Sequence, residues 1–308
     1  MMSCSQKKIE IVEVAPRDGL QNEKMLVSLE NKAELIARAI GCGVRRIEVG
    51  SFVNPKKVPQ MAGTDELVTM LPAHDDVTYI GLVMNWRGLD RGLVAGIDEV
   101  GAVCVATDTF AMRNQGQTSM ESAGIATDIV RAAIEAGKSG QVTIGAAFGC
   151  PFEGEVDPAR VVEMVRQLAE ANPREIALAD TIGVAAPAQV DALVRQVVEV
   201  IAPIPVRVHF HNTRGVGLAN AWTAVAAGAT VIDTSLGGLG GCPFAPKATG
   251  NVPTEDVVYM LERSGITTGL DLDRLIEASY WLEGVMGNPL RAMVTQAGNF
   301  PAVALGRD

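Results

Sequence analysis

The chain has 308 residues, a formal net charge of −10 at pH 7, and a hydrophobic residue content of 48%. This length and apolar content allow a packed core in one large α/β domain or in two ordinary domains. The acidic balance, without a run of Lys and Arg, argues against nucleic acid or an anionic membrane surface as a partner. An anionic ligand would have to be bound by a few placed Arg, Lys and backbone N–H groups.

The cysteine pattern is typical of a reducing compartment. The 5 cysteines are an odd number without Cys-x-x-Cys spacing, which argues against a disulfide framework and predicts a cytoplasmic location. Residues 1–8, MMSCSQKK, lead into a strand-like run without the apolar region of a signal peptide. No stretch approaches the roughly 20 uncharged apolar residues of a membrane helix, so we expect no membrane partner.

Short apolar runs rich in β-branched residues predict the strands. In chain order they lie at 9–15, 46–52, 77–84, 100–108, 141–149, 175–180, 206–211 and 230–235. Helical patterns lie at 29–41, 65–71, 87–95, 119–136, 158–171, 187–201, 217–227 and 254–264. The clearest helix signal follows Asp157, which can cap a helix whose first position is Pro158.

The alternation of apolar strands with helices predicts a parallel sheet that is covered on its faces. Its length, about 265 residues for eight units, matches a (β/α)8 TIM barrel. A doubly wound sheet is the alternative, but Pro16-Arg17-Asp18-Gly19 follows the first strand where a dinucleotide fold needs GxGxxG. We therefore predict a single barrel domain over residues 1–308, with 267–308 as a C-terminal helical extension.

Charged and polar residues gather where the predicted strands end. They are Arg17, Asp18, Glu48, Asp180, His209 and His211. In a TIM barrel the active site lies at the C-terminal ends of the strands, and burial of unpaired charge is costly. Such residues at the same end of independent strands therefore indicate an active site rather than packing. A solvated ion pair at a turn is the alternative interpretation of Arg17 and Asp18 taken alone.

The stretch HFHN, residues 209–212, holds two of the 3 histidines in the chain. In a strand, His209 and His211 point to the same face. Two imidazoles with a carboxylate and an amide oxygen suit a divalent cation, and without a thiolate cluster Mg²⁺ or Mn²⁺ is the expected ion. Such an ion can act as a Lewis acid on a substrate hydroxyl or carboxylate. An ordinary strand with two hydrogen-bonded core histidines is the alternative.

The loop 237–250 is rich in glycine and contains Cys242. Its composition indicates a mobile flap that carries a thiol, which can serve as an acid or a base if its pKa is tuned. The glycines would give the hinge its conformational freedom. A flexible linker is the alternative.

Several long segments resemble one enzyme family. They are EVAPRDGLQNE (13–23), IEVGSFVNPKKVPQM (47–61), LADTIGV (178–184), HFHNTRGVGLAN (209–220) and GGLGGCPFAPKATGNVPTEDVVYMLE (237–262). In order and over nearly the whole chain, they resemble the 3-hydroxy-3-methylglutaryl-CoA lyase family. The resemblance implies a metal-dependent TIM-barrel lyase of leucine catabolism. It would cleave a 3-hydroxy-3-methylglutaryl-CoA-like thioester by retro-Claisen chemistry to acetyl-CoA and a keto acid.

The resemblance also implies roles for individual residues. The metal ligands would be Asp18, His209, His211 and Asn251. The catalytic residues would be Arg17, Asp18, Glu48, Asp180, His209 and Cys242. Within that set, Arg17 would stabilise the enolate oxygen, and Cys242 would protonate the carbanion as the flap closes.

The substrate-binding residues that the resemblance implies are Arg17, Gln21, Glu48 and Asp180, which would shape the acyl pocket and steer the proton that leaves the C3 hydroxyl. Glu13 and Glu255 would support the metal site. Coenzyme A contacts are expected at Asn22, Lys24, Lys56 and Lys57, for which a solvated surface is the alternative. We expect an acyl-CoA as the partner and a homo-oligomer such as a dimer.

The chain departs from the family pattern at several positions. Asn212 follows the second histidine where the family has Asp, Gly50 replaces Thr, and Ala179 replaces Gly. Segments 84–86 and 111–116 also differ, and Arg214 can add a carboxylate contact or lie in an exposed loop. The sequence therefore predicts a retained reaction with an open acyl group, such as citramalyl-CoA or a longer 3-hydroxy-3-alkylglutaryl-CoA. A Claisen-type synthase and a non-catalytic binding barrel are the rival interpretations.

Overall fold

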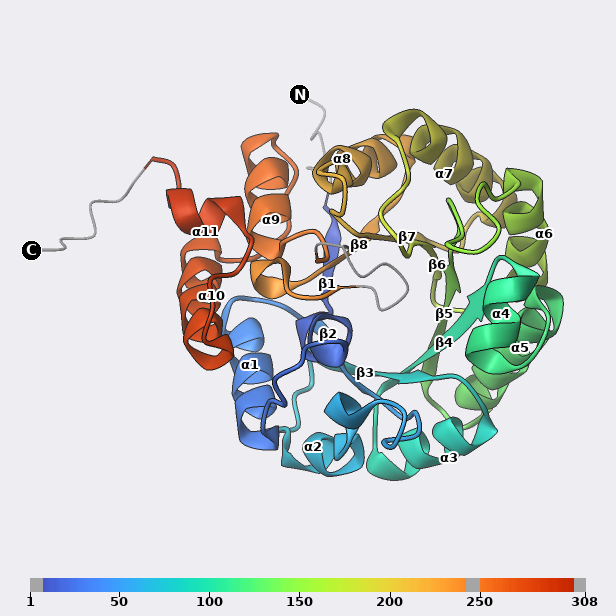
Figure 1. Ribbon diagram of the computed structural model, residues 1–308, viewed down its shortest axis with the longest axis horizontal. Coiled ribbons are helices and arrows are strands. Elements are labelled where there is room, and N and C mark those ends of the chain that lie inside the picture. Colours follow the sequence, from blue (N-terminus) through green and yellow to red (C-terminus); the bar gives the residue numbers. More distant parts are fainter. Residues whose placement is uncertain (1–7, 242–249, 302–308) are drawn as a thin grey trace, which may run out of the picture.

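The computed structural model describes residues 8–241 and 250–301 and shows a closed barrel of parallel strands in chain order (Figure 1). The strands are β1 Glu10–Glu13, β2 Arg46–Ser51, β3 Thr78–Val83, β4 Glu99–Val105, β5 Ser139–Gly145, β6 Ile176–Asp180, β7 Val206–Phe210 and β8 Val231–Thr234. Pairing of β8 with β1 closes the ring. The predicted (β/α)8 barrel is therefore confirmed.

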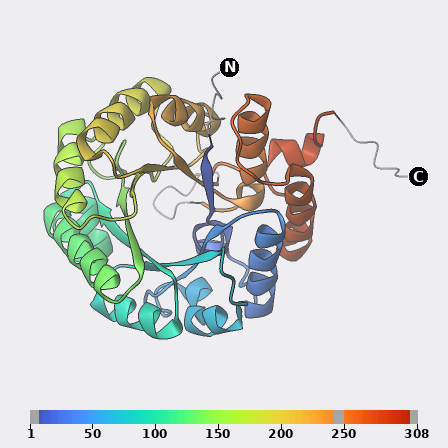
Figure 2. The same cartoon turned by 180° about the vertical axis from the view of Figure 1, so that it is seen from behind.

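Helices surround the strands on all sides, as the view from behind also shows (Figure 2). They are α1 Leu29–Gly41, α2 Thr64–Met70, α3 Trp86–Ala95, α4 Asp108–Gln115, α5 Ser119–Glu135, α6 Pro158–Ala169, α7 Pro187–Ile201, α8 Gly217–Ala227, α9 Thr254–Arg263, α10 Leu272–Met286 and α11 Met293–Ala297. Within the described ranges, no helix combines the length and apolarity that crossing a bilayer requires.

Local signals account for most of these elements. Asp157 caps α6 by accepting from the Ala159 N–H at 2.9 Å, as predicted. Helix α6 buries one apolar stripe, which consists of Val161, Val162, Met164, Val165 and Leu168. Strand β5 ends earlier than predicted because Ala146 adopts a left-handed φ of 55°, a conformation that a strand does not continue.

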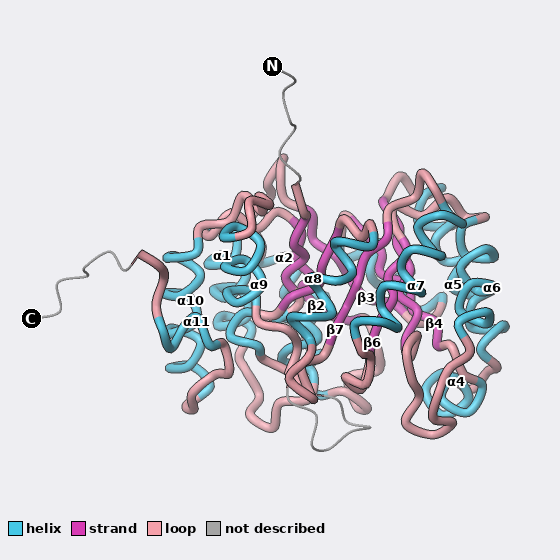
Figure 3. The backbone as a smooth tube through the Cα atoms, turned by 90° about the horizontal axis from the view of Figure 1, so that it is seen from above, coloured by secondary structure: helices cyan, strands magenta, loops and turns pink. Residues whose placement is uncertain are grey.

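Helix α4 was not predicted. The prediction extended the fourth strand to residue 108, whereas β4 ends at Val105 and α4 begins at Asp108. This short helix buries only Phe110 and Ala111, so its sequence has no amphipathic stripe to detect. Helix α4 lies at the rim of the barrel where the strands end (Figure 3).

The described part of the segment 267–308 contains α10 and α11, which are the predicted C-terminal helices. Helix α10 packs against α1 and α9 outside the ring (Figure 1). Its residues Leu275 and Leu282 are buried in one apolar cluster with Leu35 of α1.

The barrel interior is unusual at the end where the strands begin. Barrel interiors are commonly filled by branched apolar side chains. Here Arg46, Glu99, Glu175 and Arg207 are each at most 1% exposed, and their opposite charges are paired. The active-site end of the barrel therefore rests on a buried ionic layer.

Candidate active site

The C-terminal ends of the strands enclose a cavity of about 220 Å³. Its polar and charged lining includes Arg17, Asp18, Gln21, Asn22, Glu48, Arg207, His209, His211 and Asp233. Its apolar lining includes Val53, Val58, Leu82, Met84, Val103, Val105 and Phe110. The cavity therefore combines an apolar wall with converging charged groups, as ligand sites generally do.

Three predicted metal ligands meet in this cavity. His209 and His211 project inward from alternate positions at the end of β7, and Asp18 lies on a π-helical turn, Ala15–Gly19, directly after β1. The Nε2 atoms of both imidazoles lie 3.8 Å from Oδ2 of Asp18. Ligand atoms of all three residues lie within 4.8 Å of one another, a spacing that one cation can bridge.

Asn251 completes the group from the other side. An isolated β-bridge joins it to His211, and its Nδ2 donates to Oδ2 of Asp18 at 2.9 Å and to the Leu239 carbonyl at 3.2 Å. Its Oδ1 is buried and has no hydrogen-bond partner among the described residues. Because an unsatisfied buried oxygen is costly, this atom fits the role of a cation ligand, and the N and O donor set suits a divalent ion.

Both imidazoles are oriented by acceptors on their far side. Nδ1 of His209 lies 3.0 Å from Oδ2 of Asp233, and Nδ1 of His211 lies 3.0 Å from the carbonyl oxygen of Asp180. Because each partner accepts, we assign the hydrogen to Nδ1 in both rings. The lone pair of each Nε2 then faces Asp18, as metal ligation requires.

The electrostatics favour the ligand forms of Asp18 and His211. Burial opposes ionisation of Asp18, but Arg17 and the two histidines hold the pKa of its carboxyl well below the usual range. Burial, together with the neighbouring His209, lowers the pKa of His211 to about 4. An ionised Asp18 and a neutral His211 therefore face each other at neutral pH.

Arg17 is clamped between two carboxylates. Its Nε donates to Oε2 of Glu48 at 2.8 Å, and one of its terminal nitrogens donates to Oδ1 of Asp18 at 2.7 Å. The side chain is 13% exposed and lines the cavity, and burial raises the pKa of Glu48. The guanidinium is therefore a fixed positive donor at the cavity wall.

The structure does not bring the carboxylate of Asp180 into the cavity. Its two side-chain oxygens accept from the N–H groups of Val184 and Ala185, each at 2.9 Å, and the residue is 0% exposed. Asp180 therefore fixes the loop between β6 and α7 and supports His211 through its backbone. Asp180 does not line the cavity, and its catalytic and substrate-binding roles stay predictions.

Two departures from the family pattern also support loops. Arg214 donates to the carbonyls of Ile182 and Gly183 at 3.1 and 2.7 Å. Oδ1 of Asn212 accepts from Gly217 N–H at the start of α8, at 3.0 Å. Neither residue lines the cavity, and Arg214 binds loop carbonyls instead of making the carboxylate contact that the sequence allowed.

Glu13 and Glu255 hold the backbone beside the metal group. Glu13 accepts from the N–H of Ala15 at 2.8 Å and of Leu236 at 2.9 Å, and Glu255 accepts from Gly237 N–H at 3.0 Å. Both carboxyls are 0% exposed, and burial raises their pKa to about 7 for Glu13 and about 8 for Glu255. They anchor the backbone where the glycine-rich loop begins.

Of the other predicted site residues, some line the cavity and others do not. Gln21 and Asn22 line the cavity, and Asn22 donates to the Gly241 carbonyl at 2.7 Å. Lys24, Lys56 and Lys57 are exposed and do not line it. Cys242 lies outside the described residues, so its role stays a prediction.

Sequence reasoning missed Asp233 and Arg207, which line the inner part of the cavity. Both are charged residues at inward positions of apolar strands, which is the signal that identified Glu48.

The fold and the site are those of a TIM-barrel enzyme. The cavity of the barrel holds a candidate divalent-metal centre and a fixed arginine, Arg17. The model of the HMGL-like family matches residues 8–281, and the chain belongs to this family.

Two curated relatives and one solved structure illustrate the match. The chain is 44% identical to (R)-citramalyl-CoA lyase of Chloroflexus aurantiacus, covering 94% of this chain and 95% of the relative. It is 39% identical to hydroxymethylglutaryl-CoA lyase YngG of Bacillus subtilis, covering 92% and 95%. The structure of an HMG-CoA lyase from Acinetobacter baumannii with coenzyme A and 3-methylmalate has a TM-score of 0.93 at 39% identity, covering 98% and 99%. The chain is a carbon–carbon lyase.

Proposed function

We propose that the protein cleaves the coenzyme A thioester of a short 3-hydroxy-3-methyl dicarboxylic acid to acetyl-CoA and an oxo acid. The observation that carries this proposal is the convergence of Asp18, His209, His211 and Arg17 on one cavity. Metal ligands and a fixed cation at one site suit a reaction that starts at an alcohol and develops negative charge on a thioester enolate.

The metal ligands in this proposal are Asp18, His209, His211 and Asn251, with Mg²⁺ or Mn²⁺ as the ion. When bound, the ion supplies a Lewis acid for the hydroxyl and a carboxylate of the acyl group. Asp18 follows β1, the two histidines lie at the end of β7, and Asn251 follows β8. An ion held from these three places would orient the acyl group relative to the cavity wall.

Arg17 acts on the developing enolate. As the C2–C3 bond breaks, negative charge moves to the thioester oxygen, and the guanidinium supplies N–H donors without reorganisation. Glu48 holds this guanidinium in place. The resemblance assigns Gln21, Glu48 and Asp180 to the acyl pocket and to the proton that leaves the C3 hydroxyl. Protonation of the enolate carbon by Cys242 likewise stays a prediction of the resemblance.

For the acyl group, we propose citramalyl-CoA as the first candidate, which would give acetyl-CoA and pyruvate. The 44% identity to a citramalyl-CoA lyase, against 39% to a hydroxymethylglutaryl-CoA lyase, supports this choice. The related structure that contains 3-methylmalate, a methyl-substituted hydroxy dicarboxylate, also supports a short branched substrate. 3-Hydroxy-3-methylglutaryl-CoA is the second candidate, favoured by the same family membership.

A panel of thioesters tests the acyl group. Citramalyl-CoA, 3-hydroxy-3-methylglutaryl-CoA and a longer 3-hydroxy-3-alkylglutaryl-CoA are incubated with the protein and Mg²⁺ or Mn²⁺, and kcat/KM is compared. We expect the highest value for citramalyl-CoA. Far faster cleavage of 3-hydroxy-3-methylglutaryl-CoA would overturn that choice, and rapid release of free coenzyme A from acetyl-CoA and 2-oxo acids would indicate a synthase.

We also propose an acyl-CoA as the partner and a homo-oligomer such as a dimer as the assembly. Three buried free cysteines, Cys42, Cys104 and Cys150, support the predicted reducing, cytoplasmic location. The role in leucine catabolism stays a prediction of the resemblance.

A further inference from the structure

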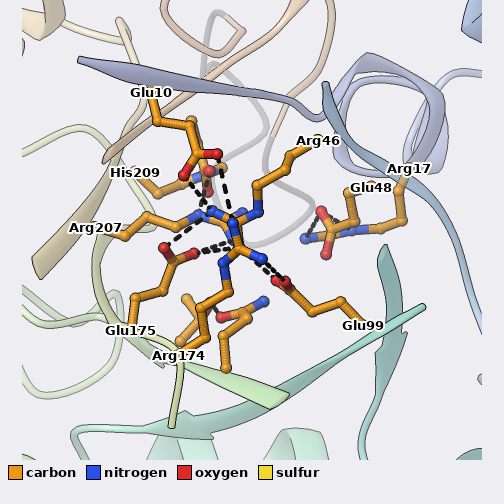
Figure 4. Close-up of polar contacts among 12 residues, drawn as sticks. Glu10, Arg17, Arg46, Glu48, Glu99, Arg174, Glu175, Arg207 and His209 are labelled. Carbon is orange, nitrogen blue, oxygen red and sulfur yellow. Dashed lines mark hydrogen bonds and ion pairs between the residues drawn. The ribbon is translucent and has the colours of Figure 1, made fainter. Parts of the chain in front are cut away.

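A chain of buried charges extends inward from His209 (Figure 4). Nδ1 of His209 meets Oδ2 of Asp233 at 3.0 Å, and the other oxygen of Asp233 accepts from Nε of Arg207. Arg207 donates onward to Oε1 of Glu175 at 3.1 Å. Arg207 and Glu175 are 1% exposed and Asp233 is 4% exposed, so water does not compete for these contacts.

The strand register builds this chain of contacts. His209 of β7 and Asp233 of β8 are paired neighbours in the parallel ladder. Arg207 precedes His209 by two residues and therefore points to the same face of β7. The contacts thus connect rigid strands rather than loops, which gives the precision that a metal ligand needs.

We propose that Asp233 and Arg207 are positioning residues for the metal ligand His209, with Asp233 orienting the imidazole and Arg207 orienting Asp233. This inference rests on the metal site proposed above. It concerns His209 alone, because His211 is held by the uncharged carbonyl of Asp180.

The geometry gives each residue a distinct task. Arg207 engages Oδ1 of Asp233, which leaves Oδ2 to accept the Nδ1 hydrogen of His209. That hydrogen bond fixes the ring plane and keeps the Nε2 lone pair toward Asp18. A carboxylate in this position also makes the imidazole a stronger donor to a cation, and loss of such a partner lowers metal affinity by about 10–100-fold.

The competing explanation is that the buried charges only stabilise the barrel. Arg46 provides the matched control, because it is buried in the same ionic layer and bonds to Glu10, Glu99 and Glu175. None of these carboxylates hydrogen-bonds to His209 among the described residues. A purely structural role predicts equal effects from Arg46 and Arg207 variants.

The experiment measures Mn²⁺ dissociation constants by electron paramagnetic resonance on the folded protein, without substrate. In Asp233→Asn the amide oxygen stays with Arg207, so the NH₂ group faces Nδ1 and moves the imidazole hydrogen to Nε2. We expect Asp233→Asn to weaken Mn²⁺ binding by about 10–100-fold and Arg207→Met to weaken it less. Arg46→Met leaves the affinity of the folded protein unchanged.

Two further measurements separate the possible failures. If Asp18→Asn leaves Mn²⁺ binding intact, the proposed metal site is wrong. If Asp18→Asn abolishes binding while Asp233→Asn and Arg207→Met match Arg46→Met, only the positioning inference is overturned.

Should the arginine variants not fold, nitrogen-15 shifts of the wild-type histidines carry the test, and with 3 histidines in the chain they are assignable. The inference requires the hydrogen of His209 on Nδ1 and not on Nε2. The opposite tautomer overturns it.

Discussion

Asn251 shows at the scale of one residue how an unsatisfied group indicates a ligand. Its Nδ2 has two acceptors, whereas its buried Oδ1 has no hydrogen-bond partner within residues 8–241 and 250–301. Protein structures seldom leave such an atom unpaired. A cation between Asp18 and the two histidines would satisfy it and explain why an amide, rather than an apolar residue, occupies this position.

Replacement of this amide tests that interpretation. Asn251→Ala removes one ligand and leaves Asp18, His209 and His211 in place, so we expect Mn²⁺ affinity to fall by about tenfold or more. Calorimetric titration of the folded variant provides the measurement. An unchanged dissociation constant would show that the amide oxygen is not a ligand.

Arg17 is the residue on which turnover should depend most directly. Arg17→Gln removes the fixed charge beside the enolate, and we expect kcat to fall by about 10²–10³, the effect of losing one oxyanion donor. Steady-state assays with citramalyl-CoA measure it. The control is Arg195→Gln, because Arg195 lies exposed on α7 and is paired with Asp191; this variant should keep full activity. If Arg17→Gln were equally active, Arg17 would not stabilise the enolate.

At the scale of the elements, the loop between β6 and α7 depends on one buried carboxylate. Asp180 accepts two backbone N–H groups and Arg214 binds two carbonyls of the same loop. Asp180 also provides the backbone carbonyl that orients His211. The loop therefore affects His211 through Asp180. Order in this loop is therefore linked to the metal group.

Asp180→Asn tests this link. An amide can accept only one of the two N–H groups through its oxygen, so we expect a loss of about 1–3 kcal/mol in the free energy of unfolding. Hydrogen exchange should accelerate at Val184 or Ala185 and not along α1. Unchanged protection at both amides would mean that the carboxylate does not hold the loop.

Sequence patterns predicted the helices and strands better than the side-chain contacts between them. The β7 histidines were found because alternate residues of a strand share a face, and Asp18 was found because it follows β1. Asp233 and Arg207 show the same signal as Glu48, a charge within an apolar strand, but their contact with His209 depends on the register of β7 with β8, which one strand does not reveal. Helix α4 escaped because it has no apolar stripe. The structure adds that the Asp180 carboxylate holds the loop after β6, and its catalytic role stays a prediction.

At the scale of the whole molecule, two buried carboxyls make stability depend on pH. Burial raises the pKa of Glu13 to about 7 and of Glu255 to about 8, from an ordinary value of 4.5. The folded state therefore holds more protons than the unfolded chain between pH 4.5 and these values. The free energy of unfolding should fall as pH rises through this window.

Glu255→Gln isolates one contribution. The variant has no proton to lose at this position, so its free energy of unfolding should fall less than that of the wild type between pH 6 and pH 9. The difference should be roughly 3 kcal/mol, since the extra proton is held over about two pH units, from pH 6 to the pKa of about 8, at about 1.4 kcal/mol per unit. Urea unfolding at the two pH values measures it, and parallel losses in both proteins would refute a buried protonated Glu255.

The proposed chemistry depends on the closed barrel, because pairing of β8 with β1 brings the groups that follow β1 beside those of β7. Retro-Claisen cleavage leaves the thioester intact, whereas hydrolysis of the thioester releases free coenzyme A. Mass spectrometry of the coenzyme A products formed from citramalyl-CoA with Mg²⁺ or Mn²⁺ is therefore the most direct measurement. We predict that the wild type forms acetyl-CoA and pyruvate in equal amounts and that Asp18→Asn forms neither. Release of free coenzyme A without acetyl-CoA would contradict retro-Claisen cleavage.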